Sequence, residues 1–483
     1  MTNRQRLTIL QINDTHAYLD EHWELFRDGA AVRHQITGGF ARIKAYFDQV
    51  RGERGNQNVL AFDNGDTLHG TYPAVTTQGE AVVGPLNRLK LDAWTVHWDF
   101  SYGTERMQEL AAMIDHPLLA CNCYCERTDK NLFPPTAVFD RGGIKVGVIG
   151  IGALLIDEAF PPEVSQGVRF TLGKEELRLH IDRLRDQEQA DLIVVLSHLG
   201  FPQDCQLAEE TDGIDIFLSG HTHNRVQEPL LINGATLIQS GCHGSFVGRL
   251  DIELHDRRVT AVDHSLVPMD DAILPDPELQ LEVDAIYAPH KEMLSEVVGK
   301  TNTDLNRYAA LESTMDNLLL DSIAATAGTE IAFSNGWRYG APIPAGKITF
   351  NDLWNIIPTN PPVSTVDMLG SEIWSMMEEN LERTYARNPF EQKGGYVKRC
   401  RGINLYCKLE NAQGSRIQQL FVEGMPVEKD KTYQVAFVTQ QGVGRKYGSN
   451  RKELKITAIE ALCNYLEMHS PVTVDIRGAV VAV

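Results

Sequence analysis

The segment Leu7-Thr-Ile-Leu-Gln-Ile-Asn-Asp14-Thr-His16 joins an apolar run of strand length to an aspartate and a histidine two residues apart. A second segment has the same design: Leu60-Ala-Phe-Asp-Asn-Gly-Asp66, in which Gly65 permits close approach of the backbone. Ligands of open α/β sheets bind at the carboxyl ends of the strands. The two segments therefore predict both a layered α/β fold and a site at the ends of its strands.

The pattern recurs along the chain. Ile193-Val-Val-Leu-Ser-His198 ends another strand with an imidazole, and Ile216-Phe-Leu-Ser-Gly-His221-Thr-His223 ends a fourth with two. His97-Trp98-Asp99 is a fifth short motif. One such residue alone is usually a cap, a turn or a surface residue, but five motifs together indicate a pocket for two divalent cations. The predicted ligands are Asp14, His16, Asp66, His97, His198, His221 and His223.

These side chains indicate the metal and the reaction. A carboxylate is the natural bridging ligand because it has two oxygens, and imidazoles suit borderline metals. We expect two divalent ions, Mn foremost, with Zn, Fe or Co as alternatives. Two-metal sites hydrolyse stable esters, so the expected nucleophile is a hydroxide that bridges the metals.

Two domains are expected from the length of 483 residues. Residues 1–268 alternate between strand-like and helix-like stretches, which is typical of layered α/β architecture. Prolines and acidic residues then mark a linker over 269–298, with an interdomain helix expected at 279–298. The second domain is expected over 299–483. The strands expected in the first domain lie at 7–12, 59–62, 145–151, 191–196, 215–218, 236–239 and 249–254.

The net charge of the chain limits the classes of molecule that it is expected to bind. The net charge of −20 disfavours nucleic acid and anionic membranes, whereas bound cations still allow a small anionic substrate. No apolar run reaches the length of about 20 residues that a membrane helix needs. The short polar N-terminus before Leu7 leaves no room for a signal peptide, so the protein is expected in the cytoplasm. No protein partner can be inferred from the sequence.

Three of the eight cysteines, Cys121, Cys123 and Cys125, alternate along the chain and would share one face of a strand. They are either a thiolate cluster for a metal or three small buried residues. The second interpretation is favoured because no CxxC or CxxH spacing accompanies them.

The chain resembles the 5′-nucleotidase group of the calcineurin-like metallophosphoesterases. Asp14 with His16, Gly65-Asp66 through Gly70, His198-Leu-Gly200 and Gly220-His221-Thr-His223 match the signature motifs of that group. Ser334-Asn335-Gly336-Trp337-Arg338 and Ile343-Pro-Ala-Gly-Lys-Ile-Thr-Phe350 are similar to segments of its C-terminal domain. The resemblance implies a four-layer α/β sandwich followed by a smaller α/β domain that binds the substrate.

The resemblance also implies roles for single residues. One metal would be held by Asp14, His16, Asp66 and His223, and the second by Asp66, as the bridge, with His198 and His221. In the second domain, Arg338 would contact the anion. Asn335 either contributes to this contact or only shapes the turn. Tyr396 and Tyr447 are candidates for stacking on a base, and a core or loop role for Tyr396 is equally compatible with the sequence.

The third motif departs from the group. Its members read Gly-Asn-His-Asp/Glu-Phe, whereas this chain has His97-Trp98-Asp99-Phe100. His97 would replace an asparagine ligand, and Trp98 stands where a histidine assists the leaving group, paired with the acid at Asp99. An indole cannot transfer a proton in that way. In another register His97 takes the catalytic role and one metal loses a ligand. His69 is a candidate replacement acid.

A similar third motif occurs in the manganese-dependent thiosulfohydrolase of the sulfur-oxidation pathway. Three hypotheses follow. The leading one is hydrolysis of a phosphate monoester, a nucleoside 5′-monophosphate, with a nucleotide as the partner. The second is removal of a sulfate group from an S-sulfonated thiol. The third is a metal-binding protein with weak or lost activity.

Overall fold

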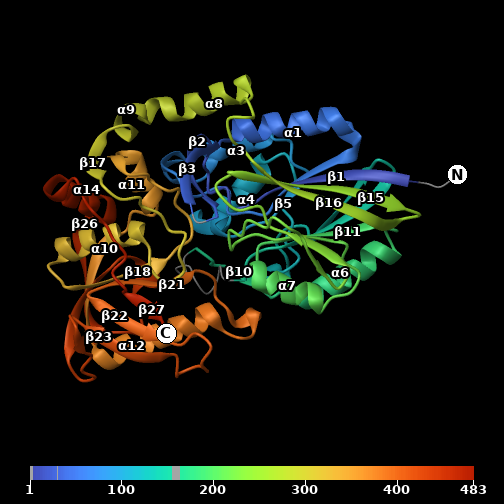
Figure 1. Ribbon diagram of the computed structural model, residues 1–483. Helices are drawn as coiled ribbons and strands as arrows, with labels where there is room; N and C mark the ends of the chain where they lie inside the picture. Colours follow the sequence, from blue (N-terminus) through green and yellow to red (C-terminus); the bar gives the residue numbers. More distant parts are fainter. Residues whose placement is uncertain (1–3, 30, 155–163) are drawn as a thin grey trace. The chain divides into compact units, whose positions relative to one another are not determined.

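The computed structural model describes residues 4–29, 31–154 and 164–483. The chain divides into two compact units (Figure 1). The first comprises residues 1–24 and 35–288, and the second residues 25–34 and 289–483. A two-stranded ribbon, β2 (Glu21–Asp28) and β3 (Ala31–Gly38), contributes residues to both units.

Two mixed sheets form the centre of the first unit, which also has a small sheet of β10 (Val168–Phe170), β6 (Cys123–Cys125) and β7 (Lys130–Asn131). One has the order β16-β15-β1-β4-β5, and the other has the order β13-β14-β12-β11-β9-β8. The first sheet consists of β1 (Arg4–Ile12), β4 (Val59–Asp63), β5 (Ala93–Trp94), β15 (Phe246–His255) and β16 (Arg258–Pro268). The second consists of β8 (Thr136–Arg141), β9 (Ile144–Ile151), β11 (Leu192–Ser197), β12 (Ile216–Leu218), β13 (Leu230–Ile232) and β14 (Ala235–Ile238). The seven strands expected in this domain are confirmed.

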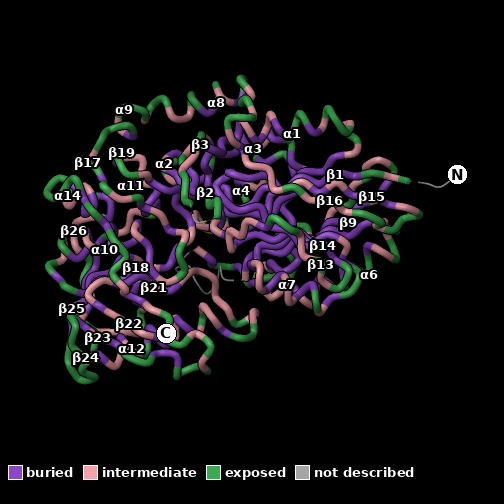
Figure 2. The backbone as a smooth tube through the Cα atoms, viewed as in Figure 1, coloured by how far each residue is buried: buried purple, intermediate pink, exposed green. Residues whose placement is uncertain are grey.

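The alternation of side chains along β1 explains the layers. Leu7 and Ile9 pack into a core shared with Val194 of the second sheet, so the sheets lie face to face. Leu10 and Ile12 point the other way, into a core that the helices α1, α3 and α4 complete. Figure 2 shows the interior of this unit as mostly buried, and every residue of the central strands β4 and β11 is buried. This arrangement is the expected four-layer α/β sandwich.

Helices cover the outer faces of the sandwich. In Figure 1, α1 lies on one side of this unit, and α6 and α7 lie on the opposite side. Helix α6 (Lys174–Asp186) packs against β9. Together with α8 (Pro277–Tyr287), the helices that the structure describes in this unit are α1 (Phe40–Arg54), α2 (Tyr72–Thr76), α3 (Glu80–Arg88), α4 (Thr104–Met113), α6 (Lys174–Asp186) and α7 (Phe201–Glu209).

The second unit is built on a five-stranded sheet, β21-β18-β25-β20-β26, and a four-stranded sheet, β24-β23-β22-β27. Helix α10 packs on the larger sheet, and α12 packs against β20, β21 and β23. The strands are β17 (Val297–Thr301), β18 (Ile331–Gly336), β19 (Gly346–Thr349), β20 (Pro362–Leu369), β21 (Tyr396–Arg401), β22 (Ile403–Cys407), β23 (Ile417–Val422), β24 (Met425–Pro426), β25 (Thr432–Phe437), β26 (Ser449–Thr457) and β27 (Val480–Ala482). The helices are α9 (Lys291–Leu294), α10 (Thr314–Ala327), α11 (Phe350–Ile356), α12 (Gly370–Tyr385), α13 (Thr439–Gly442) and α14 (Ala458–His469).

The prediction of a single helix over 279–298 is wrong. Helix α8 (Pro277–Tyr287) ends before Pro289, whose ring cannot continue the helical hydrogen bonds, and a 3₁₀ turn, the short α9 and β17 follow. Helix α8 packs on α1 and α3 and belongs to the first unit. Its apolar face, with Leu279 and Val283 buried, therefore completes the core of the first unit.

Cys121 and Cys123 are buried and Cys125 is half-buried, with Cys123 and Cys125 on the short strand β6 (Cys123–Cys125). Among the described residues, the clusters with metal-ligand geometry contain no cysteine. This placement agrees with the interpretation of small residues on a strand. In the described part of the chain, no helix has the length and apolar character that crossing a membrane requires.

Candidate metal centre

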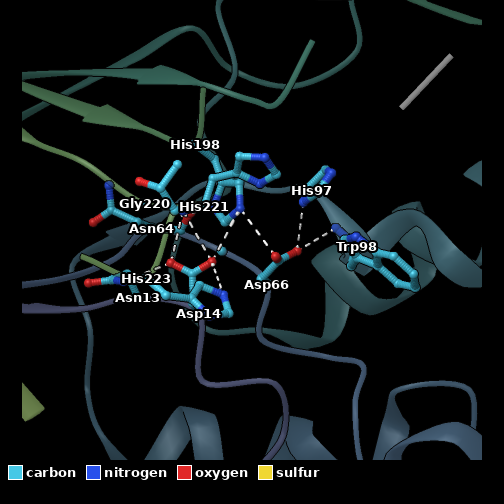
Figure 3. Close-up of polar contacts among 12 residues, drawn as sticks. Asn13, Asp14, Asn64, Asp66, His97, Trp98, His198, Gly220, His221 and His223 are labelled. Carbon is cyan, nitrogen blue, oxygen red and sulfur yellow. Dashed lines mark hydrogen bonds and ion pairs between the residues drawn. The ribbon is translucent and has the colours of Figure 1, made fainter. Parts of the chain in front are cut away.

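Strand register brings the predicted ligands together. Strands β1 and β4 are parallel neighbours with Ile12 opposite Asp63, so Asp14 and Asp66 follow at the same edge of their sheet. In the other sheet, β11 and β12 are parallel with Leu196 opposite Leu218, which places His198 and the segment of His221 and His223 at one edge. Figure 3 shows the side chains of Asp14 and Asp66 among four of the predicted histidines.

The seven side chains form two groups that share Asp66. One group is Asp66, His97, His198 and His221, and the other is Asp14, His16, Asp66 and His223. Within each group the ligand atoms lie within 4.8 Å of one another. Asp66 Oδ1 lies 3.0 Å from His97 Nδ1, whereas Asp66 Oδ2 lies 3.3 Å from His198 Nε2 and 3.8 Å from His16 Nε2. Asp66 thus lies near ligands of both groups, His97 and His198 of one and His16 of the other, as a bridging carboxylate must.

Backbone strain is concentrated at these residues. Left-handed φ values are uncommon outside glycine and occur where the surrounding structure enforces them, often at functional sites. Five of the seven ligands have such values: Asp14 (51°), His16 (49°), Asp66 (56°), His221 (72°) and His223 (58°). Gly65, at 88°, needs its missing side chain, because a Cβ there would lie 2.6 Å from the carbonyl oxygen of Thr95.

A buried polar network holds the loops. Asn64 donates from Nδ2 to the carbonyl oxygens of Ser197 (2.9 Å) and Leu218 (2.8 Å), which joins the ends of β4, β11 and β12. The carbonyl oxygen of Asn64 accepts a hydrogen bond from His198 Nδ1, so Nε2 of that ring faces the carboxylates. This contact orients the imidazole in the way that metal-ligating histidines are usually oriented.

Asp204 on α7 supports the same edge. It accepts hydrogen bonds from the hydroxyls of Ser197 (2.7 Å) and Ser219 (2.6 Å), residues that lie immediately before His198 and two residues before His221. Asp14 is held in a similar way, because its carboxylate accepts from the N–H of His221 (2.9 Å) and from Asn13 Nδ2 (2.7 Å). The candidate ligands are therefore held by side chains outside the two ligand groups, Asn13, Asn64 and Asp204, and by the backbone N–H of His221.

The electrostatics of the centre favour cations. Burial, the largest influence, raises the pKa of Asp66, but His97 and His198 outweigh it and lower this pKa well below its usual range. Burial also opposes charge on His198, yet Asp66 and Asp14 raise the pKa of this imidazole to about 10. Burial is the main cause that lowers the pKa of His16 to about 3. Ionised carboxylates at this depth need nearby positive charge.

The donor set fits two divalent ions. His198 Nε2 is buried and makes no hydrogen bond within the part of the chain that the structure describes, although two carboxylates lie near it. A proton on this nitrogen offsets one of the two negative charges, and a divalent cation in its place would balance both. Carboxylate oxygens and imidazole nitrogens together match borderline divalent metals. The candidate ligands of the sequence thus form one centre with room for ions in two groups.

Comparison with known proteins agrees with this geometry. Residues 7–225 match the family model described as calcineurin-like phosphoesterase, and residues 297–442 match the model of the 5′-nucleotidase C-terminal domain. Residues 7–225 therefore form a domain of the calcineurin-like phosphoesterase family. Members of this family are hydrolases that act on ester bonds.

Three similar proteins illustrate the relationship. The trifunctional nucleotide phosphoesterase protein YfkN of Bacillus subtilis is 25% identical over 91% of the residues of this chain. The matched region covers only 32% of the length of YfkN. A 5′-nucleotidase precursor from Thermus thermophilus is 25% identical, with a TM-score of 0.86 and 99% of each chain covered. The sulfate thiohydrolase SoxB of Thermus thermophilus shares the fold, with a TM-score of 0.92 at 23% identity, over 99% of this chain and 96% of that one.

The third motif of the phosphoesterase domain lies beside Asp66. The N–H of Trp98 donates to Asp66 Oδ1 (2.7 Å), and its indole packs against His69, with ring centroids 5.3 Å apart. Burial lowers the pKa of His69 to about 4, so this imidazole is neutral at physiological pH. His69 therefore lies next to the position where the family carries its histidine, but as a neutral ring.

Asp99 has a different role from the expected one, which was the acid paired with a catalytic histidine. Its carboxylate accepts hydrogen bonds from four backbone N–H groups, those of Asp66 (3.0 Å), Thr67 (2.8 Å), Leu68 (2.8 Å) and His97 (3.1 Å). These bonds occupy both oxygens and join the Asp66 loop to the third motif. Asp99 is thus a structural clamp for two ligand-bearing loops in this phosphoesterase.

In the second unit, three of the four candidate substrate residues lie close together. Strands β18 and β21 pair with Gly336 opposite Tyr396, and the guanidinium of Arg338 lies 5.1 Å from the centroid of the Tyr396 ring. Arg338 Nη2 donates to the carbonyl oxygen of Gly395 (3.1 Å). Asn335 Nδ2 donates to Gln441 Oε1 (2.7 Å), so this side chain helps to position the segment after β25.

Tyr447 is engaged elsewhere in this unit. Its hydroxyl donates to Glu379 Oε2 on α12 (2.5 Å), and the ammonium group of Lys446 lies 5.1 Å from the centroid of its ring. These contacts give Tyr447 a structural partner on α12. Its proposed role in stacking on a base stays a prediction.

Two residues at the centre were missed by the sequence analysis. His243 is buried at a φ of 58°, and its ring lies beside His16 and His223, while Glu24 is fully buried near its Nδ1. His243 follows strand β14 by five residues, so the strand-end rule that identified the other histidines would also have selected it. Glu24 lies within β2, and nothing in its local sequence distinguishes it.

Proposed function

We propose that this protein is a two-metal hydrolase that cleaves a phosphate monoester, with a nucleoside 5′-monophosphate as substrate. The observation that carries the proposal is the pair of ligand groups that share Asp66, within a domain that matches the phosphoesterase family. The 5′-nucleotidase C-terminal domain over residues 297–442 supports a nucleotide as the substrate.

The residues of the chain have distinct tasks in this reaction. Asp14, His16, Asp66 and His223 would hold one ion, and Asp66, His97, His198 and His221 the other. Bound divalent ions supply Lewis acidity and lower the pKa of water to near neutrality. Arg338 would bind the anionic group through its planar guanidinium, which matches phosphate geometry. The 5′-alkoxide that leaves needs a proton, and Trp98 cannot donate one in place of the family histidine.

The absence of an imidazole at position 98 motivates a second candidate, the cleavage of an S-sulfonated thiol. Water oxygen would attach to the sulfonate sulfur and the bond between the two sulfurs would break, giving sulfate, a thiolate and protons released to solvent. A thiol has a pKa of about 8.5, so a thiolate leaves without an acid far more easily than an alkoxide. The tryptophan in the third motif is compatible with such a leaving group.

A substrate panel tests the proposal. The Mn²⁺-loaded protein is assayed with nucleoside 5′-monophosphates, sugar phosphates and an S-sulfonated cysteine, with release of phosphate and sulfate measured separately. We expect phosphate release to be fastest from a nucleoside 5′-monophosphate. Turnover of the S-sulfonated thiol alone would replace the first function with the second, and no turnover of any ester would contradict both.

Replacing Arg338 with alanine should raise KM by roughly 10–100-fold, because a hydrogen bond to a charged group contributes about 1.5–3 kcal/mol. The value of kcat should change less if the contact forms equally with substrate and transition state. Arg387→Ala, at an exposed arginine of the same unit, is the matched control and should leave KM unchanged. Equal KM values for the two variants would exclude Arg338 from substrate binding.

A further inference from the structure

A third cluster of ionisable side chains lies next to the metal centre. His22, Glu24 and His243 have ligand-type atoms within 4.8 Å of one another. Glu24 is already well paired: Arg225 Nη2 lies 2.8 Å from its Oε1, and the hydroxyl of Ser245 donates to its Oε2 (2.8 Å). His22 Nε2 also lies 3.1 Å from the Ser245 hydroxyl. A guanidinium and a hydroxyl in these places disfavour another cation, so the cluster is a hydrogen-bonded support.

This support reaches one set of ligands from several directions. The backbone N–H of His243 donates to the carbonyl oxygen of Asp14 (2.7 Å). The centroid of the His243 ring lies 6.0 Å from that of His16 and 6.0 Å from that of His223. Arg225, the ion-pair partner of Glu24, follows His223 by two residues. The ligands reached by these contacts, Asp14, His16 and His223, all belong to the same metal group.

The His243 ring also contacts Glu24 and Tyr18. Its Nδ1 lies 3.7 Å from Glu24 Oε2, and the Tyr18 ring packs against it with centroids 4.6 Å apart. Glu24 and His243 are both fully buried, so neither has freedom to move into solvent. Residues packed around a metal site help to orient its ligating histidines, and the loss of such partners typically reduces metal affinity by about 10–100-fold.

We propose that Glu24 and His243 are positioning residues that hold His16 and His223, and so set the affinity of the metal ion bound by Asp14, His16 and His223. The ion bound by His97, His198 and His221 has other supports, namely Asn64 and Asp204. The pair would thus act on one of the two ions selectively. The inference rests on the two-metal site of the proposed function and adds a determinant of its occupancy.

The test uses the full-length protein and Mn²⁺ alone. His243→Phe keeps an aromatic ring beside Tyr18 but removes the nitrogen that faces Glu24, and Glu24→Gln removes the charge at nearly constant volume. We expect each variant to bind one of the two ions about 10–100-fold more weakly and the other with unchanged affinity. Metal content after dialysis should fall toward one ion per chain, and electron paramagnetic resonance should show isolated rather than coupled Mn²⁺.

His116→Phe is the matched control. His116 is likewise a buried imidazole, but its ring packs beside Trp94, 6.4 Å away between centroids. This variant should keep both ions, and thermal unfolding of the metal-free proteins should show comparable stability for the two phenylalanine variants. Wild-type affinity for both ions in His243→Phe and Glu24→Gln would overturn the proposal. Equal weakening of both ions would also overturn it, because it would indicate a general structural defect.

A double variant identifies which ion is affected. His221→Ala alone should weaken the ion on the His97 side, so combining it with His243→Phe should leave no tightly bound metal. Retention of one ion in the double variant would place His243 on the wrong side and reject the assignment. Metal binding is measured without substrate, so this result and the substrate panel can fail independently of each other.

Discussion

Replacing Asp66 with asparagine should reduce the rate of hydrolysis by roughly 10³-fold or more and the number of tightly bound Mn²⁺ ions from two to at most one. Asp66 is the residue shared by both ligand groups, and its two oxygens face His97 on one side and His198 and His16 on the other. An amide has one oxygen and no charge. Metal ions contribute several kcal/mol of transition-state stabilisation, and each 1.4 kcal/mol or so is a factor of ten in rate.

Asp63→Asn is the control for this substitution. Asp63 is the last residue of β4, three residues before Asp66; it is likewise buried and lies outside both ligand groups. Burial raises its pKa to about 8, so the native side chain is already largely uncharged near neutral pH and an amide is a close mimic. We expect this variant to keep both ions. If Asp66→Asn also retained two tightly bound ions, measured by metal analysis after dialysis, the bridging role would be refuted.

Replacing Trp98 with histidine, together with His97→Asn, should raise the rate of phosphate monoester hydrolysis by roughly 10²–10⁴-fold, the usual contribution of general acid–base catalysis. The double change restores the third motif of the 5′-nucleotidases. Because the N–H of residue 98 is bonded to Asp66 and the Asp99 clamp is retained, the new side chain starts from a fixed backbone. The gain should appear in kcat and follow the ionisation of an imidazole, with an ordinary pKa of about 6.5.

The outcome separates the candidate functions. His97→Asn with Trp98→Phe is the matched control, since it alters the same positions without adding a proton donor, and it should show no gain. A restored motif that left phosphate ester turnover unchanged while abolishing release of sulfate from an S-sulfonated thiol would favour the second function. Steady-state rates on both substrates with equal Mn²⁺ loading provide the measurement.

The ligand set could be predicted because its signals are local. Each of the first-recognised motifs is an apolar run followed within a few residues by a carboxylate or an imidazole, as in Leu7 to His16. Parallel pairing of β1 with β4 and of β11 with β12 then brings distant motifs to common edges. Periodicity and spacing are sufficient for this step, because side chains past the ends of parallel strands converge whatever the loops between them.

Local sequence patterns did not predict two features: the break in the helix expected over 279–298 and the role of Asp99. The apolar spacing of 279–298 is compatible with one helix, but Pro289 interrupts it and α8 joins the core of the first unit. Asp99 resembles the acid partner of a catalytic histidine, yet its oxygens accept four backbone N–H groups. Three of these donors come from a loop more than 30 residues away, so no pattern around Asp99 could reveal them.

The amino-acid sequence alone was enough to assign the family, the strand-end ligands and the break in the third motif at Trp98, because each depends on residues near one another in the chain. The tertiary structure alone revealed that Glu24 and His243 lie behind His16 and His223, and that Asn64 and Asp204 support His198. Residues 24 and 243 are joined only by folding, and burial then converts their charge and hydrogen bonds into constraints on the metal ligands.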